Sequence, residues 1–432
     1  MEKQRFLFLN YADNGGAGIA NLNIAKALLS LGHEVLFLVA NKQSNLDFVV
    51  EIKKNPQPII YLTFWQRNLT RIRNRILPPK KTDKPKVPHY NSEYYYYNTD
   101  EQQSPFDLGE ILPHVHFSPN IIIGGWISFF VNLEVIGKIA TIFNAKAYVQ
   151  MNDMAHLTGG CHYNSDCLEY TQSCEKCPAL GENTNKKQSS INLQNKKKYI
   201  EKYNIEVIAG SEGNIQEARR STLYKNQKNI RVINGILDFY VFNNKKRDIA
   251  KQVFDIPVNK KVIFSGANLI DDQRKGFDKM LVSLTHLNEL LVKEKKEIVY
   301  IIAGSNNNFN YNFSNIEVRK MDRISDKILF SLLHQSADVY ASPSVQDTGP
   351  VMVIQALASG TPVVGYQLGF VETFVRNNEN GFVIPKFDTQ LFAEKIFEVL
   401  YFSDFDTLSV NAMKSVKDSF SNKQFEFFFE QN

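Results

Sequence analysis

One stretch in the second half of the chain decides the fold. Its residues, 342–365, read SPSVQDTGPVMVIQALASGTPVVG. Pro350 suits the first turn of a helix, and Gly360 suits its end. Asp347 or Thr348 suits the cap of the same helix. The apolar residues just before the stretch are typical of a buried strand. The pattern predicts a strand followed by a helix, whose free backbone N–H groups and positive dipole end can receive a diphosphate or a nucleotide sugar.

Two polar side chains of this stretch are spaced to meet one ligand. Asp347 and Gln355 are eight residues apart, a little over two helical turns, so both can face the same side. Each side chain can hydrogen-bond a hydroxyl group. The alternative is that Asp347 only caps the helix and that Gln355 is an ordinary helix-face residue.

Strands and helices alternate on both sides of this stretch. Residues 5–40 read as a strand, a glycine loop over residues 15–18, a helix and a second buried strand, which is a parallel βαβ unit. Residues 261–401 repeat the alternation several times. Open parallel sheets bind ligands at the carboxyl ends of their strands. We therefore expect an α/β protein of two Rossmann-like, doubly wound domains that face an interdomain cleft.

Length and composition agree with two globular domains. The chain has 432 residues, of which 43% are hydrophobic and 22% charged. This length is too great for a single hydrophobic core, and this composition excludes broad disorder. The net charge of +5 is too mild for a dedicated nucleic-acid binder, and we expect no nucleic-acid partner. The longest apolar stretch, residues 121–131, is shorter than the roughly 20 residues of a membrane-spanning helix. Since the apolar run at the start is too short for a secretory leader, we expect a cytoplasmic protein.

The stretch at residues 342–364 resembles the donor-site signature of retaining glycosyltransferases of family 4, the group 1 glycosyl transferases, which have the GT-B architecture. In that family two glutamates at this spacing contact the donor, the first at the sugar and the second at the ribose hydroxyls. Asp347 and Gln355 stand at those positions, and the turn Thr348-Gly349-Pro350 lies between them. The resemblance covers nearly the whole chain. It implies a retaining glycosyltransferase that uses a nucleotide-diphosphate sugar of the UDP or GDP type.

A second part of the resemblance is a phosphate loop. Residues 265–277 match the loop in which the family has a lysine before a glycine and a helix, where it neutralises the donor diphosphate. Lys275 is the candidate, and either it or Arg274 stabilises the departing nucleotide diphosphate. The alternative is a solvated surface pair. The GT-B type stabilises the leaving group without a metal, so the resemblance implies no catalytic metal despite the acidic pair Asp271-Asp272.

Two less specific matches lie elsewhere in the chain. Gly15, Gly16 and Ala17 match the family's N-terminal glycine loop, where the absence of bulky side chains lets the backbone approach the donor phosphate or the acceptor. Glu372 matches a position where the family often has an acidic residue near the donor. A glycine pair between a strand and a helix is also a common packing turn.

A third motif resembles one subgroup of these transferases, which carries an aspartate, then TGGCHY, then clustered cysteines. Residues 152–163 read NDMAHLTGGCHY. Asp153 follows a predicted strand that points into the cleft, so it can orient or deprotonate the acceptor hydroxyl. The alternative is that Asp153 only caps the next segment.

All four cysteines of the chain fall in a segment over residues 156–180. Four thiolates within one short segment can close a tetrahedral zinc site, and such a site is structural because it leaves no open position for substrate. Disulfides and free buried thiols remain alternatives. The candidate ligands are Cys161, Cys167, Cys174 and Cys177.

A basic insertion over residues 65–105 interrupts the first half. Between residues 65 and 89, eight lysines and arginines face a single acid. This composition is typical of a solvated flexible loop. It also favours a surface that docks on anionic lipid or on a phosphate-bearing acceptor, and hence peripheral contact with the inner membrane face.

We expect three parts of the chain. Residues 1–200 form an N-terminal, acceptor-side domain, residues 201–402 a C-terminal, nucleotide-sugar-binding domain, and residues 403–432 a helix that crosses back to the first domain. The interdomain linker is expected near Asn234 and Gly235.

The expected activity is transfer of a sugar to a hydroxyl of a glycan or lipid-linked glycan, in the biosynthesis of a surface polysaccharide. The alternative is a catalytically weak nucleotide-sugar-binding or scaffold protein of a glycan assembly complex. That alternative draws on Asn152, which replaces the subgroup's usual histidine, and on Gln355, which replaces a carboxylate.

Overall fold

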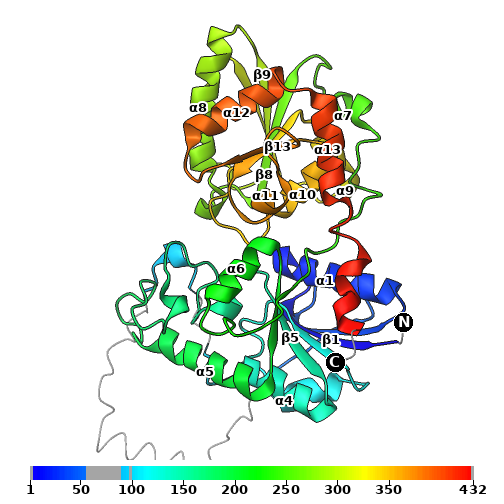
Figure 1. Ribbon diagram of the computed structural model, residues 1–432, viewed down its shortest axis with the longest axis vertical. Coiled ribbons are helices and arrows are strands. Elements are labelled where there is room, and N and C mark those ends of the chain that lie inside the picture. The colour runs from blue at the N-terminus through cyan, green and yellow to red at the C-terminus, as the bar shows by residue number, and fades with distance from the viewer. Residues whose placement is uncertain (1–2, 55–88, 97–99, 430–432) are drawn as a thin grey trace, which may run out of the picture.

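The chain forms two α/β domains, one above the other in Figure 1. The computed structural model describes residues 3–54, 89–96 and 100–429. None of the helices in these ranges is long and apolar enough to cross a bilayer.

The first domain is built on a parallel sheet in the order β3-β2-β1-β4-β5-β6-β7. Its central strands are apolar and buried on both faces, as parallel strands covered by helices require. Phe6, Phe8 and Phe37 point to one face, while Leu7 and Leu9 point to the other. The strands are β1 Arg5–Ala12, β2 Glu34–Asn41, β3 Val49–Glu51, β4 Ile121–Gly124, β5 Lys146–Gln150, β6 Glu206–Ala209 and β7 Arg231–Val232.

Helices cover both faces of this sheet. The longer ones are α1 Gly15–Ser30, α4 Leu133–Phe143, α5 Gln188–Tyr203 and α6 Glu212–Arg220, with the single turn α3 Leu108–Ile111 and the 3-10 turns η1 Ser92–Tyr94, η2 Leu112–His114, η3 Ala155–Leu157 and η4 Glu169–Thr171. The expected glycine loop at residues 15–18 is instead the first turn of α1. Gly18 is required there, because a Cβ at this position would lie 2.6 Å from the carbonyl oxygen of Ala12.

The second domain has a parallel sheet in the order β10-β9-β8-β11-β12-β13. Its strands are β8 Lys261–Leu269, β9 Ile298–Ser305, β10 Ile316–Met321, β11 Val339–Ser342, β12 Val363–Tyr366 and β13 Gly381–Ile384. Its helices are α7 Arg247–Val253, α8 Phe277–Lys293, α9 Lys327–Ser336, α10 Val351–Ala358, α11 Gly369–Phe374, α12 Thr389–Tyr401 and α13 Phe405–Lys417, with the 3-10 turn η5 Gln273–Lys275. Two sheets of parallel strands with interleaved helices confirm the expected doubly wound α/β fold class.

The domain boundary expected after residue 200 is wrong. Strand β6 pairs with β5, and β7 pairs with β6, so both strands belong to the first sheet. Residues 206–211 are a strand followed by a small-residue turn. This sequence pattern is the same at the end of one sheet as at the start of the next, so it could not fix the boundary. The first domain therefore runs on to the linker near Asn234 and Gly235.

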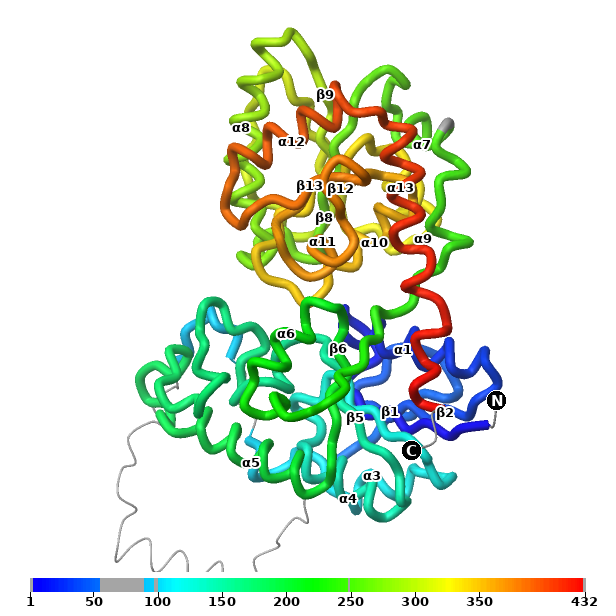
Figure 2. The backbone as a smooth tube through the Cα atoms, in the orientation of Figure 1, coloured from blue at the N-terminus to red at the C-terminus, as the bar shows by residue number. Residues whose placement is uncertain are grey.

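The last described segment returns to the first domain, as the red tube in Figure 2 shows. Helix α13 packs against α10 of the second domain. The 3-10 segment η6, Asn422–Phe429, then places Phe425 and Phe428 in the core of the first domain. The ring of Phe428 lies 5.4 Å from that of Phe6.

In each sheet, the order in which successive strands are added changes direction at a single point. The reversal falls between β1 and β4 in the first domain and between β8 and β11 in the second. The loops after such strands open side by side at the carboxyl edge of the sheet and form the usual ligand site of this fold. The candidate residues of the sequence lie in or near these loops.

Candidate active site

The phosphate loop and the donor turn meet at the edge of the second sheet. Lys275 ends η5, after β8, and Asp347 lies in the turn after the neighbouring strand β11. The Lys275 Nζ and the Asp347 Oδ2 are 2.5 Å apart. Both side chains are largely buried, with 22% and 11% of their surface exposed. Burial alone raises the pKa of Asp347, but the Lys275 ammonium outweighs it and holds this pKa below the ordinary value.

Asp347 does not cap helix α10, contrary to one reading of its position. The residue at the N-cap is Pro350, whose side chain makes no capping hydrogen bond. Asp347 Oδ1 instead accepts a hydrogen bond from the backbone N–H of Gly349, which shapes the turn. The backbone donors at the start of α10 are therefore not occupied by the Asp347 carboxylate.

Arg274 is neither a solvated surface residue nor a free cation. Its Nη2 lies 2.6 Å from Asp272 Oδ2. Its guanidinium lies over the rings of Tyr163, at 4.0 Å, and Tyr95, at 4.9 Å, both in the first domain. The Tyr95 hydroxyl also donates to Asp272 Oδ1 at 2.7 Å. We call Asp272, Arg274, Lys275 and Asp347 the donor-side cluster.

The turn after Asp347 also joins the two domains. The Thr348 hydroxyl donates to the carbonyl of Asn152 at 2.8 Å, and the Ser211 hydroxyl donates to the carbonyl of Thr348 at 3.2 Å. A Cβ on Gly349 would meet the ring of Phe370 at 2.9 Å, so the turn passes close to α11. Asn152 and Ser211 follow strands of the first sheet, so the donor turn lies against the ligand-binding edge of the first domain.

The remaining donor candidates lie farther from the cluster. Gln355 is half-buried on α10, and Glu372 is exposed on α11, where it accepts a hydrogen bond from Gln367. A Cβ on Gly15 or Gly16 would find open space within 4 Å. The start of α1 thus has room for a ligand. The contacts of these residues do not bring them to Lys275 or Asp347.

Asp153 stands at the centre of a hydrogen-bond network in the first domain. Its Oδ2 lies 2.6 Å from His162 Nδ1 and accepts from Trp126 Nε1 at 2.9 Å. Its Oδ1 accepts from the backbone N–H of Ala155 at 2.8 Å. Burial raises the pKa of Asp153, but His162 and these donors outweigh it and lower the pKa below the ordinary value. A carboxylate held in this way is a weak base, so the geometry favours orienting an acceptor hydroxyl over deprotonating it.

A cavity of about 210 Å³ opens beside Asp153. We call it the acceptor-side cavity. Its walls come from the loops after β4 and β5, from residues 100–105 and from α5. All of its lining residues belong to the first domain: Asp100, Glu101, Gln103, Pro105, Gly125, Trp126, Ile127, Ser128, Phe129, Val131, Asn132, Leu133, Asn152, Asp153, Ala155, His156 and Lys196.

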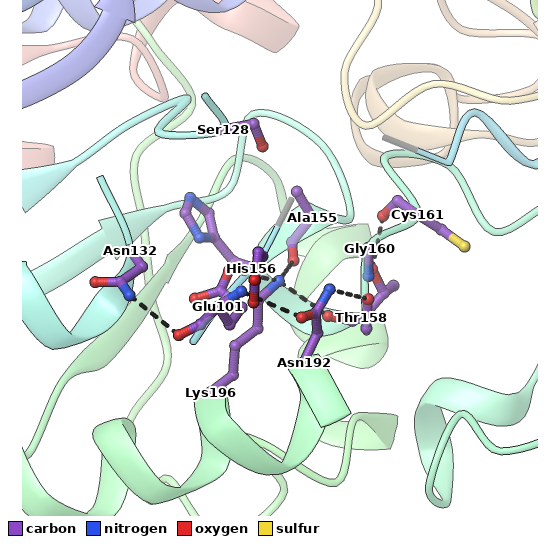
Figure 3. Close-up of polar contacts among 12 residues, drawn as sticks. Glu101, Ser128, Asn132, Ala155, His156, Thr158, Gly160, Cys161, Asn192 and Lys196 are labelled. Carbon is purple, nitrogen blue, oxygen red and sulfur yellow. Dashed lines mark hydrogen bonds and ion pairs between the residues drawn. The ribbon is translucent and has the colours of Figure 1, made fainter. Parts of the chain in front are cut away.

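An ion pair between Glu101 and Lys196 lies in the wall of this cavity (Figure 3). The Lys196 Nζ lies 3.5 Å from Glu101 Oε1 and donates to the carbonyls of Ala155 and Thr158. Glu101 is 6% exposed, and its Oε2 has no hydrogen-bond partner among the described residues. Burial also lowers the pKa of His156, which lines the cavity, to about 4, so this ring is neutral near pH 7.

The four cysteines gather around one small hollow. All of them line a cavity of about 10 Å³, and all are free thiols. A hydrogen bond from Cys161 lowers the pKa of Cys177 to about 6. Among the described residues, however, no three histidine, cysteine or acidic side chains stand in an arrangement that would hold a metal ion. The cysteines therefore share a site, and the structural zinc expected from the sequence stays a prediction.

Comparison with known proteins identifies one part of the chain. Residues 246–404 match the family model described as Glycosyl transferases group 1. The match lies within the second domain, which is thus similar to a group 1 glycosyl transferase domain. The D-inositol 3-phosphate glycosyltransferase of Mycolicibacterium smegmatis is 26% identical over 182 residues, which are 40% of this chain and 40% of that relative. The chain thus matches less than half the length of this curated relative.

Solved structures match the whole two-domain fold. Sucrose-phosphate synthase from Thermosynechococcus elongatus superposes with a TM-score of 0.61 and 13% identity, covering 99% of this chain and 97% of that one. Anabaena HepE in complex with UDP and glucose superposes with a TM-score of 0.59 and 14% identity, covering 99% of both chains. These matches confirm the GT-B fold, and identities this low say nothing more.

Sequence reasoning selected some of the residues that the structure brings together here. It selected Lys275, Arg274, Asp347 and Asp153, which the structure places in two polar networks that meet at the interdomain contact. It missed Tyr95, Tyr163 and the pair Glu101–Lys196 as site residues. Tyr163 ends the motif at residues 152–163, but no local pattern marks the other three, because they come together only through folding. Most of the basic insertion, with its expected membrane contact, lies outside the described residues.

Proposed function

We propose that this protein is a retaining glycosyltransferase that moves a sugar from a nucleotide-diphosphate donor to a hydroxyl of an acceptor, without a catalytic metal. One observation carries the proposal. The Lys275–Asp347 pair lies at the reversal point of a group 1 glycosyl transferase domain, and the donor turn that contains Asp347 contacts Asn152, next to Asp153. Groups that suit a diphosphate and a sugar hydroxyl thus stand on one side, and a group that suits an acceptor hydroxyl stands on the other.

The donor diphosphate takes the place of the internal carboxylates. Lys275 and Arg274 each hold a carboxylate now, at 2.5 Å and 2.6 Å. A diphosphate carries more negative charge than either carboxylate and presents more acceptor oxygens, so it competes for both cations. The displaced Asp347 is then available to accept a hydrogen bond from a hydroxyl of the donor sugar. The start of α10 adds backbone donors, and the resemblance assigns Gln355 to the ribose and Glu372 to a place near the donor.

The chemical step exchanges one bond for another on the same face of the sugar. The bond from the anomeric carbon to the diphosphate oxygen breaks, and its electron pair leaves with the diphosphate, stabilised by Lys275 and Arg274. The acceptor oxygen forms the new bond to the anomeric carbon. Its proton passes to an oxygen of the departing diphosphate, while Asp153 orients the hydroxyl. Retention follows because attack and departure share one face.

The donor and acceptor classes follow from similarity and from charge. Anabaena HepE, which has the same fold, is seen with UDP and glucose, and this supports a UDP-type donor. We propose a glycan or lipid-linked glycan acceptor in polysaccharide biosynthesis, and a cytoplasmic protein whose basic insertion contacts the inner membrane face.

A rival function is a nucleotide-sugar-binding or scaffold protein with little activity. Two observations favour this rival. The cations of the donor-side cluster are already paired with carboxylates of the protein, and Gln355 carries an amide in place of a carboxylate. Transfer of a sugar by the purified chain would exclude this rival.

The first experiment is a thermal-shift screen of the full chain in EDTA against UDP, GDP, ADP and their common sugar conjugates. A ligand that binds only the folded state raises the melting temperature. We expect a selective rise with UDP and its conjugates that does not need a metal, followed by release of UDP when an acceptor is added. If no nucleotide raises the melting temperature, the donor site proposed here is wrong.

A further inference from the structure

The acceptor-side cavity has a charge pattern that restricts what it can hold. Three carboxyl groups line it, from Asp100, Glu101 and Asp153, beside the ammonium of Lys196. Asp153 stays ionised because its pKa is lowered, whereas burial raises the pKa of Glu101 although Lys196 opposes the rise. His156 adds no positive charge near pH 7, since its pKa is about 4. The described lining is therefore acidic.

The single lysine is not available to a ligand. Its ammonium donates to the carbonyl of Ala155 at 2.7 Å and to that of Thr158 at 3.0 Å, and its third neighbour is Glu101 Oε1 at 3.5 Å. Two of the three donors of the ammonium are thus bonded to carbonyls, and the carboxyl group of Glu101 is its ion-pair partner. A phosphate or carboxylate on a ligand would therefore enter an acidic cavity without gaining a cation from the described walls.

Unused acceptors in the same walls suit hydroxyl donors. Glu101 is fixed from both sides, since its N–H donates to Asn192 Oδ1 at 3.2 Å and its carbonyl accepts from Asn132 Nδ2 at 3.0 Å. Its Oε2 nevertheless has no partner, although the residue is only 6% exposed. A buried acceptor left unpaired is unfavourable, because it has lost its hydrogen bonds to water. A hydroxyl group from a ligand would remove that cost.

The shape of the cavity agrees with one ring rather than a chain of sugars. Its volume of about 210 Å³ is below the roughly 300–1,000 Å³ of pockets that enclose drug-sized ligands. Trp126 and Phe129 supply apolar wall beside the acidic groups. A sugar ring has the same division, with C–H groups on its faces and hydroxyls at its edge.

Given the proposed function, we infer that the acceptor-side cavity takes one neutral, hydroxyl-rich sugar ring as the acceptor and rejects rings that carry phosphate or carboxylate. The ring enters with one hydroxyl toward Asp153, and other hydroxyls donate to Glu101 and the polar side chains around it. The acceptor's own charge, if it has any, lies outside the cavity.

Matched pairs of sugars test this inference on the full chain. Ligand-observed saturation-transfer NMR in the presence of UDP compares methyl hexosides with the corresponding hexose 6-phosphates and hexuronic acids. We expect at least one neutral ring to bind and each of its anionic partners to bind at least tenfold more weakly. An anionic member that binds as well as its neutral partner overturns the inference, and so does the failure of every neutral ring to bind.

Two neighbouring glutamines supply a variant and its control. Gln103 is exposed and lines the cavity, whereas Gln102 is exposed and does not. We expect Gln103→Lys to reduce the preference for neutral rings to about threefold or less, and Gln102→Lys to leave it unchanged. Equal effects of the two variants would show that general surface charge, not the cavity, sets the preference.

A buried variant adds a second measurement. We expect Glu101→Gln to weaken binding of the neutral ring severalfold while the thermal shift caused by UDP stays the same. The UDP shift also separates the two proposals. Loss of UDP binding with an intact neutral preference would contradict the proposed function alone, and UDP binding with an anionic preference would contradict this inference alone.

Discussion

In the second domain, Lys275 and Arg274 each already hold a carboxylate, whereas in the first domain a cavity stands open with an unpaired oxygen on Glu101 in its wall. The donor-side cluster is thus neutralised within the protein, and a ligand must displace protein groups to bind. The acceptor-side cavity is already present, so a ligand can bind in it with little rearrangement of the protein. A donor must therefore compete with protein carboxylates for two cations, whereas an acceptor enters a cavity that is already open and whose described lining is acidic.

The largest effect is expected from removing the phosphate-loop lysine. Lys275→Ala should lower kcat/KM about 10³-fold, because a preorganised charge aimed at the leaving group supplies stabilisation of this order. Lys279→Ala, which removes an exposed lysine paired with Asp278 on α8, is the matched control and should change little. Steady-state kinetics with a UDP-sugar measures this change in kcat/KM. If Lys275→Ala keeps an activity within tenfold of wild type, Lys275 does not stabilise the leaving group.

A substitution at Asp153, on the acceptor side, is expected to lower kcat without changing the affinity for the donor. Asp153→Asn should lower kcat about 10²-fold, since orientation of the acceptor hydroxyl is lost while the donor-side cluster is untouched. The dissociation constant for UDP, measured by calorimetry, should stay within twofold. Asp107→Asn removes an exposed capping carboxylate of the same domain and controls for net charge. A parallel loss of UDP affinity in Asp153→Asn would show that the two sides are not separate.

Acid should destabilise both domains through buried neutral histidines. Burial lowers the pKa of His334, in the second domain, to about 3, and that of His156, in the first, to about 4. Because the folded pKa lies below the unfolded value of about 6.5, only the unfolded chain takes up a proton as the pH falls, and stability is lost. Between pH 7 and pH 5 each histidine should cost about 2 kcal/mol.

Urea unfolding at the two pH values measures this loss. His334→Leu should reduce the pH dependence by about 2 kcal/mol, since the ring is packed among aromatic side chains and neither ring nitrogen has a partner among the described residues. His116→Leu, at an exposed position, should leave the pH dependence as it is. An unchanged slope in His334→Leu would mean that His334 is protonated in the folded protein.

Displacement of an internal carboxylate can be tested by weakening it in advance. Asp272→Asn keeps an oxygen that can accept from the Tyr95 hydroxyl and from the Arg274 N–H, but removes the charge that holds the guanidinium. We therefore expect UDP to bind about fivefold more tightly, as the loss of a competing ion pair allows. Calorimetry at fixed salt gives the answer. Weaker binding in this variant would mean that Asp272 positions Arg274 rather than competes for it.

The cysteine segment should matter for stability more than for either binding site. We keep the prediction of one structural zinc, although no three histidine, cysteine or acidic side chains among the described residues are arranged to hold a metal ion. Metal analysis of the purified chain should then find about one zinc, and a chelator should speed thiol labelling and lower the melting temperature with the UDP shift unchanged. Zinc well below one per chain would leave four free thiols, of which Cys177, with a pKa of about 6, should react first.

The sequence was informative where a function depends on a local pattern. Lys275 and Asp347 could be predicted because each stands in a short motif between a strand and a helix, and parallel strands bring such turns to one edge. The acceptor-side cavity could not, because Glu101 and Lys196 are far apart in sequence and meet only when α5 packs on the sheet. The boundary error at β6 has the same origin, since strand pairing is a long-range property.

The return of Phe425 and Phe428 to the first domain has a consequence for synthesis. These rings complete a core whose other residues precede the linker near Asn234, about 190 residues earlier. At about 5–20 residues per second, that gap takes on the order of 10–40 s on the ribosome. During this time the first domain is present without the last part of its core and exposes an apolar slot. Its folding is therefore completed after the second domain has emerged, and a chaperone that covers apolar surface has a defined interval in which to act.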